Sequence, residues 1–166
     1  MLINQFRILE KLYPDEAEFF IENRSALERG YTLHYDWIFE HISDDMPIED
    51  CRFVLDVLDM YRVMTFSLGK LPENDRLKSD HFAIFRGFDG NEESSLFGYT
   101  RYFIVDLKRY DELRKNIEDL DGFNTHIPMR EAYERMLREW KEVRKQIRAG
   151  ESLPRNEIER ILNATK

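Results

Sequence analysis

The residues whose types and spacing could do chemistry gather in one stretch, residues 82–106, which reads FAIFRGFDGNEESSLFGYTRYFIVD. Gly87 and Gly90 could form a phosphate-binding turn there. Their spacing does not match the dinucleotide motif G-x-G-x-x-G, and the chain has no G-K-S or G-K-T that would complete a P-loop. The spacing therefore argues against both standard kinds of nucleotide site.

The same turn could begin a calcium-binding loop at Asp89. Such a loop needs a glycine at its sixth position and a glutamate at its twelfth, where this chain has Ser94 and Thr100. We therefore reject calcium. We interpret Asp89 as a helix cap, with Glu92 completing a capping box three residues later.

Gly98 lies well inside the helix predicted to follow this turn, where a glycine costs about 1 kcal/mol relative to alanine. A glycine at that position is explained if another element approaches closely, either within the chain or from a partner. We predict a contact surface in this stretch, made of Arg86, Asp89, Gly98, Tyr99 and Arg101.

The histidines and the cysteine form no recognised catalytic or metal-binding motif. His34 and His41 would lie two turns apart on one helix face, which is too far for one metal ion. Cys51 falls on an apolar helical stripe, where a thiol behaves as a small hydrophobic group. We predict no metal, no cofactor and no catalytic residue, so the balance is against an enzyme.

A nucleic-acid function is the alternative. The spacing R-x4-6-H, which resembles that of HEPN-type ribonucleases, occurs from Arg76 to His81 and from Arg29 to His34. Both pairs fall in a loop or at a helix end, and an arginine-rich chain contains such matches by chance. The alternative is therefore either binding of nucleic acid or metal-independent cleavage of RNA.

Four cations near the end of a predicted helix could contact nucleic acid, namely Lys141, Arg144, Lys145 and Arg148. The simpler interpretation is a solvated face, because cations at a helix C-terminus complement the helix dipole. The net charge of −8 and the pI near 5.1 also argue against nonspecific binding to DNA or RNA.

Length and composition favour one helical domain. The 166 residues include 13% aromatic side chains, a content typical of an aromatic core or of an interface. One cysteine rules out an internal disulfide, and no apolar run approaches the roughly 20 residues that span a bilayer. We expect a cytoplasmic protein without membrane contact that self-associates into a homo-oligomer and acts non-enzymatically through protein contacts.

Apolar residues recur at helical spacing along nearly the whole chain. The predicted helices cover residues 1–12, 14–29, 31–40, 47–68, a stretch from Asp89 to about Ile104, 106–121, 129–149 and 153–164. The predicted fold class is all-α. An N-terminal helical hairpin packs with a larger helical part, and there is at most a short extended segment at residues 82–88. We predict one domain, 1–166, with possible sub-parts 1–46 and 47–166.

Several short motifs follow one another in a characteristic order: Glu28-Arg29-Gly30-Tyr31, Cys51-Arg52, Gly87-Phe88-Asp89, Gly98-Tyr99 with Arg101, Gly122-Phe123-Asn124 and Asn156-Glu157-Ile158. In these motifs the chain resembles the YfbU family of bacterial proteins over nearly its whole length. The resemblance implies a multihelical fold with a helical hairpin packed on a second helical part. It implies no enzyme activity, cofactor or catalytic residue.

Overall fold

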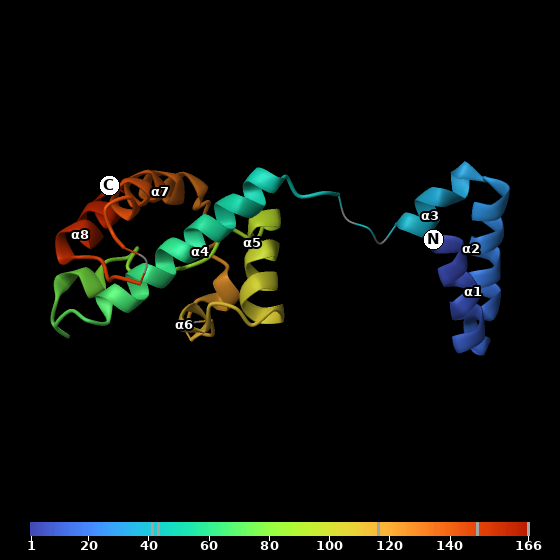
Figure 1. The fold of residues 1–166 in the computed structure, drawn as a ribbon, viewed down its shortest axis with the longest axis horizontal. Helices are drawn as coiled ribbons and strands as arrows, with labels where there is room; N and C mark the ends of the chain where they lie inside the picture. Colours follow the sequence, from blue (N-terminus) through green and yellow to red (C-terminus); the bar gives the residue numbers. More distant parts are fainter. Residues whose placement is uncertain (41, 43, 116, 149, 166) are drawn as a thin grey trace. The chain divides into compact units, whose positions relative to one another are not determined.

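The computed structural model describes residues 1–40, 42, 44–115, 117–148 and 150–165. The fold is all-α, as predicted, and the described residues contain one isolated β-bridge but no strand (Figure 1). The chain divides into two compact units, Met1–Asp45 and Met46–Lys166. We call them the N-terminal unit and the main unit and describe each by itself. The division falls one residue before the boundary drawn from the sequence between the two sub-parts.

The N-terminal unit is built on the predicted hairpin of α1 (Leu2–Leu12) and α2 (Ala17–Arg29), joined by a 3-10 turn. Gly30 ends α2 with a left-handed backbone, at φ +70°. The short helix α3 (Tyr35–Phe39) follows. A second 3-10 turn, Thr32–His34, leads into it. Packing of the hairpin against the larger part stays a prediction.

Charged side chains on the two long helices hold the hairpin together. The guanidinium of Arg24 donates to Glu10 at 2.5 Å and to Glu28 at 3.0 Å, and Arg7 donates to Glu28 at 2.8 Å. The Arg24–Glu10 and Arg7–Glu28 contacts cross from α1 to α2, whereas the Arg24–Glu28 contact lies within α2. Exposed ion pairs contribute little stability each, about 0.2–1 kcal/mol.

The main unit is organised around α4 (Ile48–Leu68), which contacts α5 (Ser94–Arg101), α6 (Asp111–Arg114), α7 (Arg130–Arg144) and α8 (Arg155–Asn163). Figure 1 shows α4 running between the α7–α8 pair and the α5–α6 pair. Its buried residues point to several sides: Val54, Val57, Leu58, Met60, Tyr61, Met64 and Leu68. The prediction of a central helix at residues 47–68 is confirmed.

An aromatic cluster fills the centre of the main unit. Its five rings, at most 2% exposed, are those of Tyr61, Phe85, Phe88, Phe123 and Tyr133. The Tyr133 ring lies 5.4 to 5.9 Å from the rings of Tyr61, Phe85 and Phe88. Burial raises the pKa of both tyrosine hydroxyls. The aromatic content of this unit therefore includes a true core.

The prediction of one helix over residues 106–121 is wrong for most of that range, because α6 has only four residues. Lys108 and Tyr110 adopt left-handed backbone angles, which interrupt a helix. Tertiary contacts hold Tyr110 there: its hydroxyl donates to Asp59 at 2.9 Å, and the Arg62 guanidinium lies 4.1 Å from its ring centre. Asn116 lies outside the described residues.

Two other helices are shorter than predicted. The helix expected from Asp89 starts only at Ser94, and a π-helical turn, Tyr102–Asp106, continues it. The helix expected at residues 129–149 ends at Arg144 as α7, and Ala149 lies outside the described residues. The last helix, α8, agrees with its prediction within two residues at its start and one at its end.

The buried carboxylate of Glu93 sets the start of α7. It accepts backbone N–H bonds from Met129 at 2.9 and 3.0 Å and from Arg130 at 2.7 Å. It also accepts the Asp89 N–H at 3.1 Å. We had predicted that Glu92 makes the reciprocal bond of the capping box. That prediction is wrong, because Glu93 makes this bond. A negative charge at this position also complements the positive end of the α7 dipole.

Replacing Glu93 by alanine leaves three N–H groups without their acceptor. We expect Glu93→Ala to lower the free energy of unfolding by about 2–4 kcal/mol, measured by urea denaturation. The matched control is Glu92→Ala, since Glu92 is exposed and makes no described side-chain bond. Its expected change is within about 0.5 kcal/mol. Equal losses in the two variants would contradict the role assigned to Glu93.

Candidate functional site

The two G-F motifs of the chain meet in the structure. We call residues 85–90 and 121–126 the paired loops. The Phe88 N–H donates to the carbonyl of Phe123 at 3.1 Å, and the Thr125 N–H donates to the carbonyl of Phe88 at 3.1 Å. These bonds form the isolated parallel bridge between Phe88 and Asn124. The segment predicted to be extended at residues 82–88 is therefore paired only at its end.

Gly87 is required by this pairing. Its backbone angle is left-handed, at φ +102°, and a Cβ atom would stand 1.8 Å from the carbonyl oxygen of Phe123. In the facing loop Asp121, Phe123 and His126 also have positive φ, at 45°, 72° and 55°. Non-glycine residues hold such angles only where surrounding contacts impose them. The paired loops are therefore a strained and closely fitted part of the main unit.

The side chain of Asn124 holds the two loops together. Its Oδ1 accepts the Gly90 N–H at 3.0 Å and the His126 N–H at 3.2 Å. Beside it lies a small cavity of about 200 Å³, whose polar lining includes His81, Arg86 and Asp121. The Arg86 side chain donates to the carbonyl of His81 at 3.0 Å, and His126 contacts Asp121 at 2.8 Å. The cavity can hold a small polar group but contains no cysteine or serine nucleophile.

Three residues of the predicted contact surface, Arg86, Asp89 and Arg101, lie around the paired loops. Asp89 is buried and its carboxylate accepts the Asn91 N–H at 2.7 Å, so it caps the turn before α5. Arg101 donates to the carbonyl of Gly122 at 3.1 Å. The structure thus brings the three together and engages each of them within the chain. The sequence did not indicate Glu93 or Asn124, which hold the same region.

Tyr99 and Gly98 lie away from the loops, on α5. The Tyr99 ring packs against Phe103 at 5.2 Å and stacks on Tyr102 at 6.4 Å. Partial burial raises the pKa of the Tyr99 hydroxyl. A Cβ atom on Gly98 would meet no atom within 4 Å. The interpretation of Gly98 as a close approach is therefore wrong within the main unit, and contact with another chain stays a prediction.

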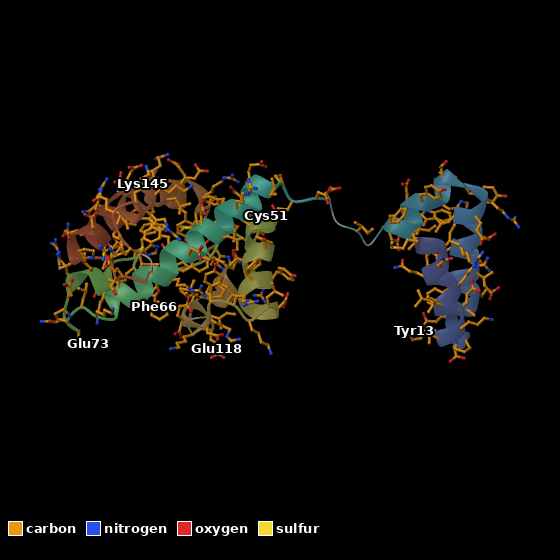
Figure 2. The ribbon with its side chains drawn as sticks, viewed as in Figure 1. Tyr13, Cys51, Phe66, Glu73, Glu118 and Lys145 are labelled. Atoms are coloured by element: carbon orange, nitrogen blue, oxygen red, sulfur yellow. The ribbon has the colours of Figure 1, made fainter. Side chains whose placement is uncertain are left out.

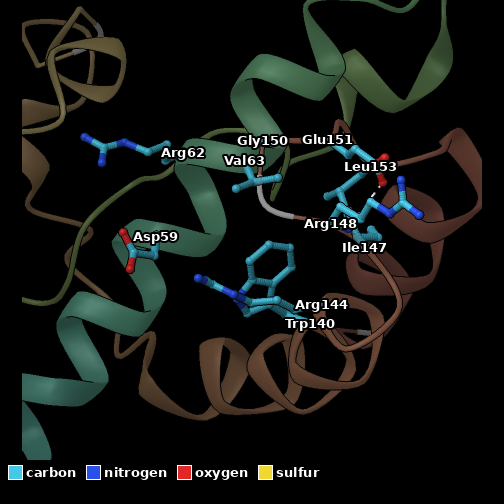
Figure 3. A pocket seen from close by; sticks show the side chains of 10 residues that line it. All are labelled: Asp59, Arg62, Val63, Trp140, Arg144, Ile147, Arg148, Gly150, Glu151 and Leu153. Atoms are coloured by element: carbon cyan, nitrogen blue, oxygen red, sulfur yellow. Dashed lines mark hydrogen bonds between the residues drawn. The ribbon is translucent and has the colours of Figure 1, made fainter.

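The four cations proposed for nucleic acid have different surroundings. Lys141 pairs with Asp56 at 3.0 Å, and Lys145 pairs with Glu142 at 2.7 Å. The Arg144 guanidinium lies 5.5 Å from the ring centre of Trp140. The lysines therefore have acidic neighbours, whereas Arg144 and Arg148 line a cleft of about 360 Å³ beside α4 and α7 (Figure 3).

The sequence did not indicate this cleft, because Trp140 reads as one more apolar residue of an amphipathic helix. In the structure its indole is 4% exposed and forms part of the wall. Asp59 and Arg62 of α4 line the opposite side. Figure 3 shows Trp140 and Arg144 side by side, with Asp59 across from them.

The N-terminal unit presents a different kind of surface. It has a groove of about 800 Å³ whose apolar lining includes Phe6, Phe19, Tyr31 and Trp37. His34 also lines it, and the Nδ1 atom of His34 is buried without a described hydrogen-bond partner. His41, the other histidine considered for a metal, lies outside the described residues. Among the residues that the structure describes, no three His, Cys, Asp or Glu side chains are placed to hold a metal ion.

Comparisons with known proteins match the chain over its full extent. The family model described as YfbU domain matches residues 1–164. A UPF0304 protein of Methanocaldococcus jannaschii is 34% identical over 165 residues, which cover 99% of this chain and 95% of the relative. Both matches include the two compact units.

None of the described helices combines the length and the apolar character needed to cross a membrane.

The two glycines, Gly87 and Gly98, allow opposite predictions. Gly87→Ala places a methyl group on the Phe123 carbonyl, and we expect it to lower the free energy of unfolding by roughly 3 kcal/mol or more. Gly98→Ala adds a methyl group in open space on a helix. We expect it to raise the free energy of unfolding by about 1 kcal/mol. Chemical denaturation of both variants measures the difference. A stable Gly87→Ala variant would contradict the close approach of the paired loops.

Proposed function

The chain belongs to the YfbU family, and from this premise we propose that it acts non-enzymatically through protein–protein contacts. The contact we propose joins two copies of the chain through the apolar surface of their N-terminal units. The place of action we propose is the cytoplasm, where the free thiol of Cys51 stays reduced.

The exposure of apolar side chains on the N-terminal unit carries this proposal. Among its described residues, Ala26 is the only apolar side chain that is buried. Eleven of the 17 exposed large hydrophobic residues described for the chain belong to this unit. They are Met1, Ile8, Leu12, Tyr13, Phe19, Ile21, Tyr31, Leu33, Trp37, Phe39 and Ile42. In Figure 2 the side chain of Tyr13 stands at the end of the hairpin.

A unit of this kind has only a small core of half-buried side chains such as Phe6 and Phe20. Domains near 40 residues usually need disulfides, metals or association to be stable. Full burial of one Leu, Ile or Phe side chain contributes about 1.5–3 kcal/mol, so a few of these residues suffice to stabilise an interface. Exposed apolar areas of this density mark interaction sites. The main unit, by contrast, buries its own aromatic cluster.

A second copy is the occupant that we propose. In a twofold dimer the same surface faces itself, so one apolar patch is matched by an identical patch. The N-terminal unit contains ten acidic and four basic residues, a net charge of −6. Two such units repel at long range. The attraction between the two units must therefore come from apolar contact. Added salt should strengthen the association, because it screens the repulsion between the two negative charges.

Nucleic-acid binding, the alternative, has weaker support. Lys141 and Lys145 already have acidic partners, and the main unit carries 23 acidic and 21 basic residues. Electrostatic binding to a phosphate backbone needs several free cations on one surface.

Sedimentation of the full chain over about 1–100 μM tests the proposed dimer. We expect an assembly larger than a monomer, and a stronger one at about 500 mM than at about 50 mM salt. Phe19→Glu places a charge on the apolar surface and should weaken association at least about tenfold. A monomer at every concentration would refute the proposal.

Phe66→Glu is the matched control. Phe66 of α4 is 57% exposed and Phe19 of α2 is 60% exposed, so the two substitutions alter similar surfaces in different units. Figure 2 labels Phe66 on the main unit. We expect Phe66→Glu to leave association unchanged. Equal weakening by both variants would place the contact elsewhere.

A further inference from the structure

We propose that the cleft between α4, α7 and the segment that follows α7 is a binding site for a small monocarboxylate with an apolar body. This site lies within the main unit and does not depend on the proposed self-association. Residues Asp59, Arg62 and Val63 form one side, and Trp140 and Arg144 form the other. Ile147, Arg148, Glu151 and Leu153 close the cleft from the segment after α7 (Figure 3).

The apolar part of the ligand is indicated by the walls. Trp140 and Leu153 are each 4% exposed, and Val63 and Ile147 are half-buried. These side chains offer one aromatic and three aliphatic surfaces to the same space. The volume of about 360 Å³ is at the lower end of the range for ligand sites, about 300–1,000 Å³. It therefore suits a single ring or a short hydrocarbon chain.

Some of the charged side chains that line the cleft already have hydrogen-bonding partners, and others have none described. Arg62 donates to Glu112 at 2.6 Å and covers the ring of Tyr110, so its charge is engaged outside the cleft. Asp59 accepts the Tyr110 hydroxyl at 2.9 Å. Those contacts engage the Arg62 guanidinium outside the cleft and occupy one carboxylate oxygen of Asp59.

Arg144 and Arg148 remain available. No acidic side chain in the described ranges lies within 4.0 Å of either guanidinium. Arg144 is fixed over the Trp140 ring, which leaves its N–H groups free to donate. A planar guanidinium donates two parallel hydrogen bonds to a carboxylate or a phosphate. Arg144, beside Trp140, therefore favours an anionic head group, and Arg148 adds a positive charge at the other end of the cleft.

The two acids of the lining decide between these head groups. Asp59 stands across the cleft from Arg144, and Glu151 accepts the backbone N–H of Arg148 at 3.2 Å. Their negative charges oppose a second charge on the ligand. A singly charged carboxylate on Arg144 meets less repulsion from these acids than a doubly charged phosphate does. The lining thus selects a monocarboxylate.

The fluorescence of Trp140 can be used to measure ligand binding in the cleft. The chain has two tryptophans, Trp37 in the N-terminal unit and Trp140 in the cleft. In a Trp37→Phe chain the fluorescence reports on the cleft alone. The probes are hexanoate, hexanol, hexyl phosphate and hexylammonium, which share one hydrocarbon chain and differ in charge. We expect saturable binding of hexanoate with a dissociation constant of about 1 mM or lower. Hexanol and hexylammonium should bind at least about tenfold more weakly.

Substitutions then test which cations hold the head group. In the same background, Arg144→Gln should weaken hexanoate binding about tenfold, because it removes a charge-assisted hydrogen bond, and Arg148→Gln should weaken it less. Arg138→Gln, an exposed arginine of α7 outside the cleft, should leave binding unchanged. Circular dichroism confirms that each variant is folded.

The outcomes separate cleanly. Selective, saturable binding of hexanoate that depends on Arg144 more than on Arg148 supports the proposal. Equal binding of hexanol, tighter binding of hexyl phosphate, a loss in Arg138→Gln as large as in Arg144→Gln, or no saturation by about 10 mM hexanoate would overturn it.

Discussion

The main unit depends on one buried charge, the carboxylate of Glu93. A buried carboxylate is unfavourable unless donors surround it, and here three backbone N–H groups do so. Those donors belong to the turn before α5 and to the first turn of α7. One side chain therefore fixes the position of α7 relative to the turn that carries Gly87 and Asp89. The paired loops lie between these two points, and the aromatic cluster packs beneath them.

Periodicity predicted the elements whose structure is determined by apolar burial. The hairpin of α1 and α2, the central helix α4 and the amphipathic helix α7 were found where apolar spacing indicated them. The prediction was wrong for residues 106–121, where Leu107, Tyr110 and Leu113 have helical spacing. Asp59 and Arg62 hold Tyr110 from a different helix, and contacts of that kind leave no mark in the local pattern.

The candidate site was predicted in part for a similar reason. Glycines at turns and a capping aspartate have local signatures, so Gly87, Asp89 and the region of Arg101 were identified from the chain. Glu93 differs from its neighbour Glu92 only through what it contacts 36 residues away. The cleft of Trp140 and Arg144 likewise forms only when α4 and α7 are brought together. Gly98 shows the reverse case, since a rule about mid-helix glycine predicted a close approach that the described residues of the main unit do not make.

The order of Glu93 and α7 along the chain has a consequence for biosynthesis. Glu93 leaves the ribosome before Met129, the residue whose N–H it receives. At about 5–20 residues per second, the 36 intervening residues take roughly 2–7 s to appear. The acceptor of these bonds is therefore synthesised before the donors of α7, so the Glu93 contacts to α7 can form only after residue 130 has been added.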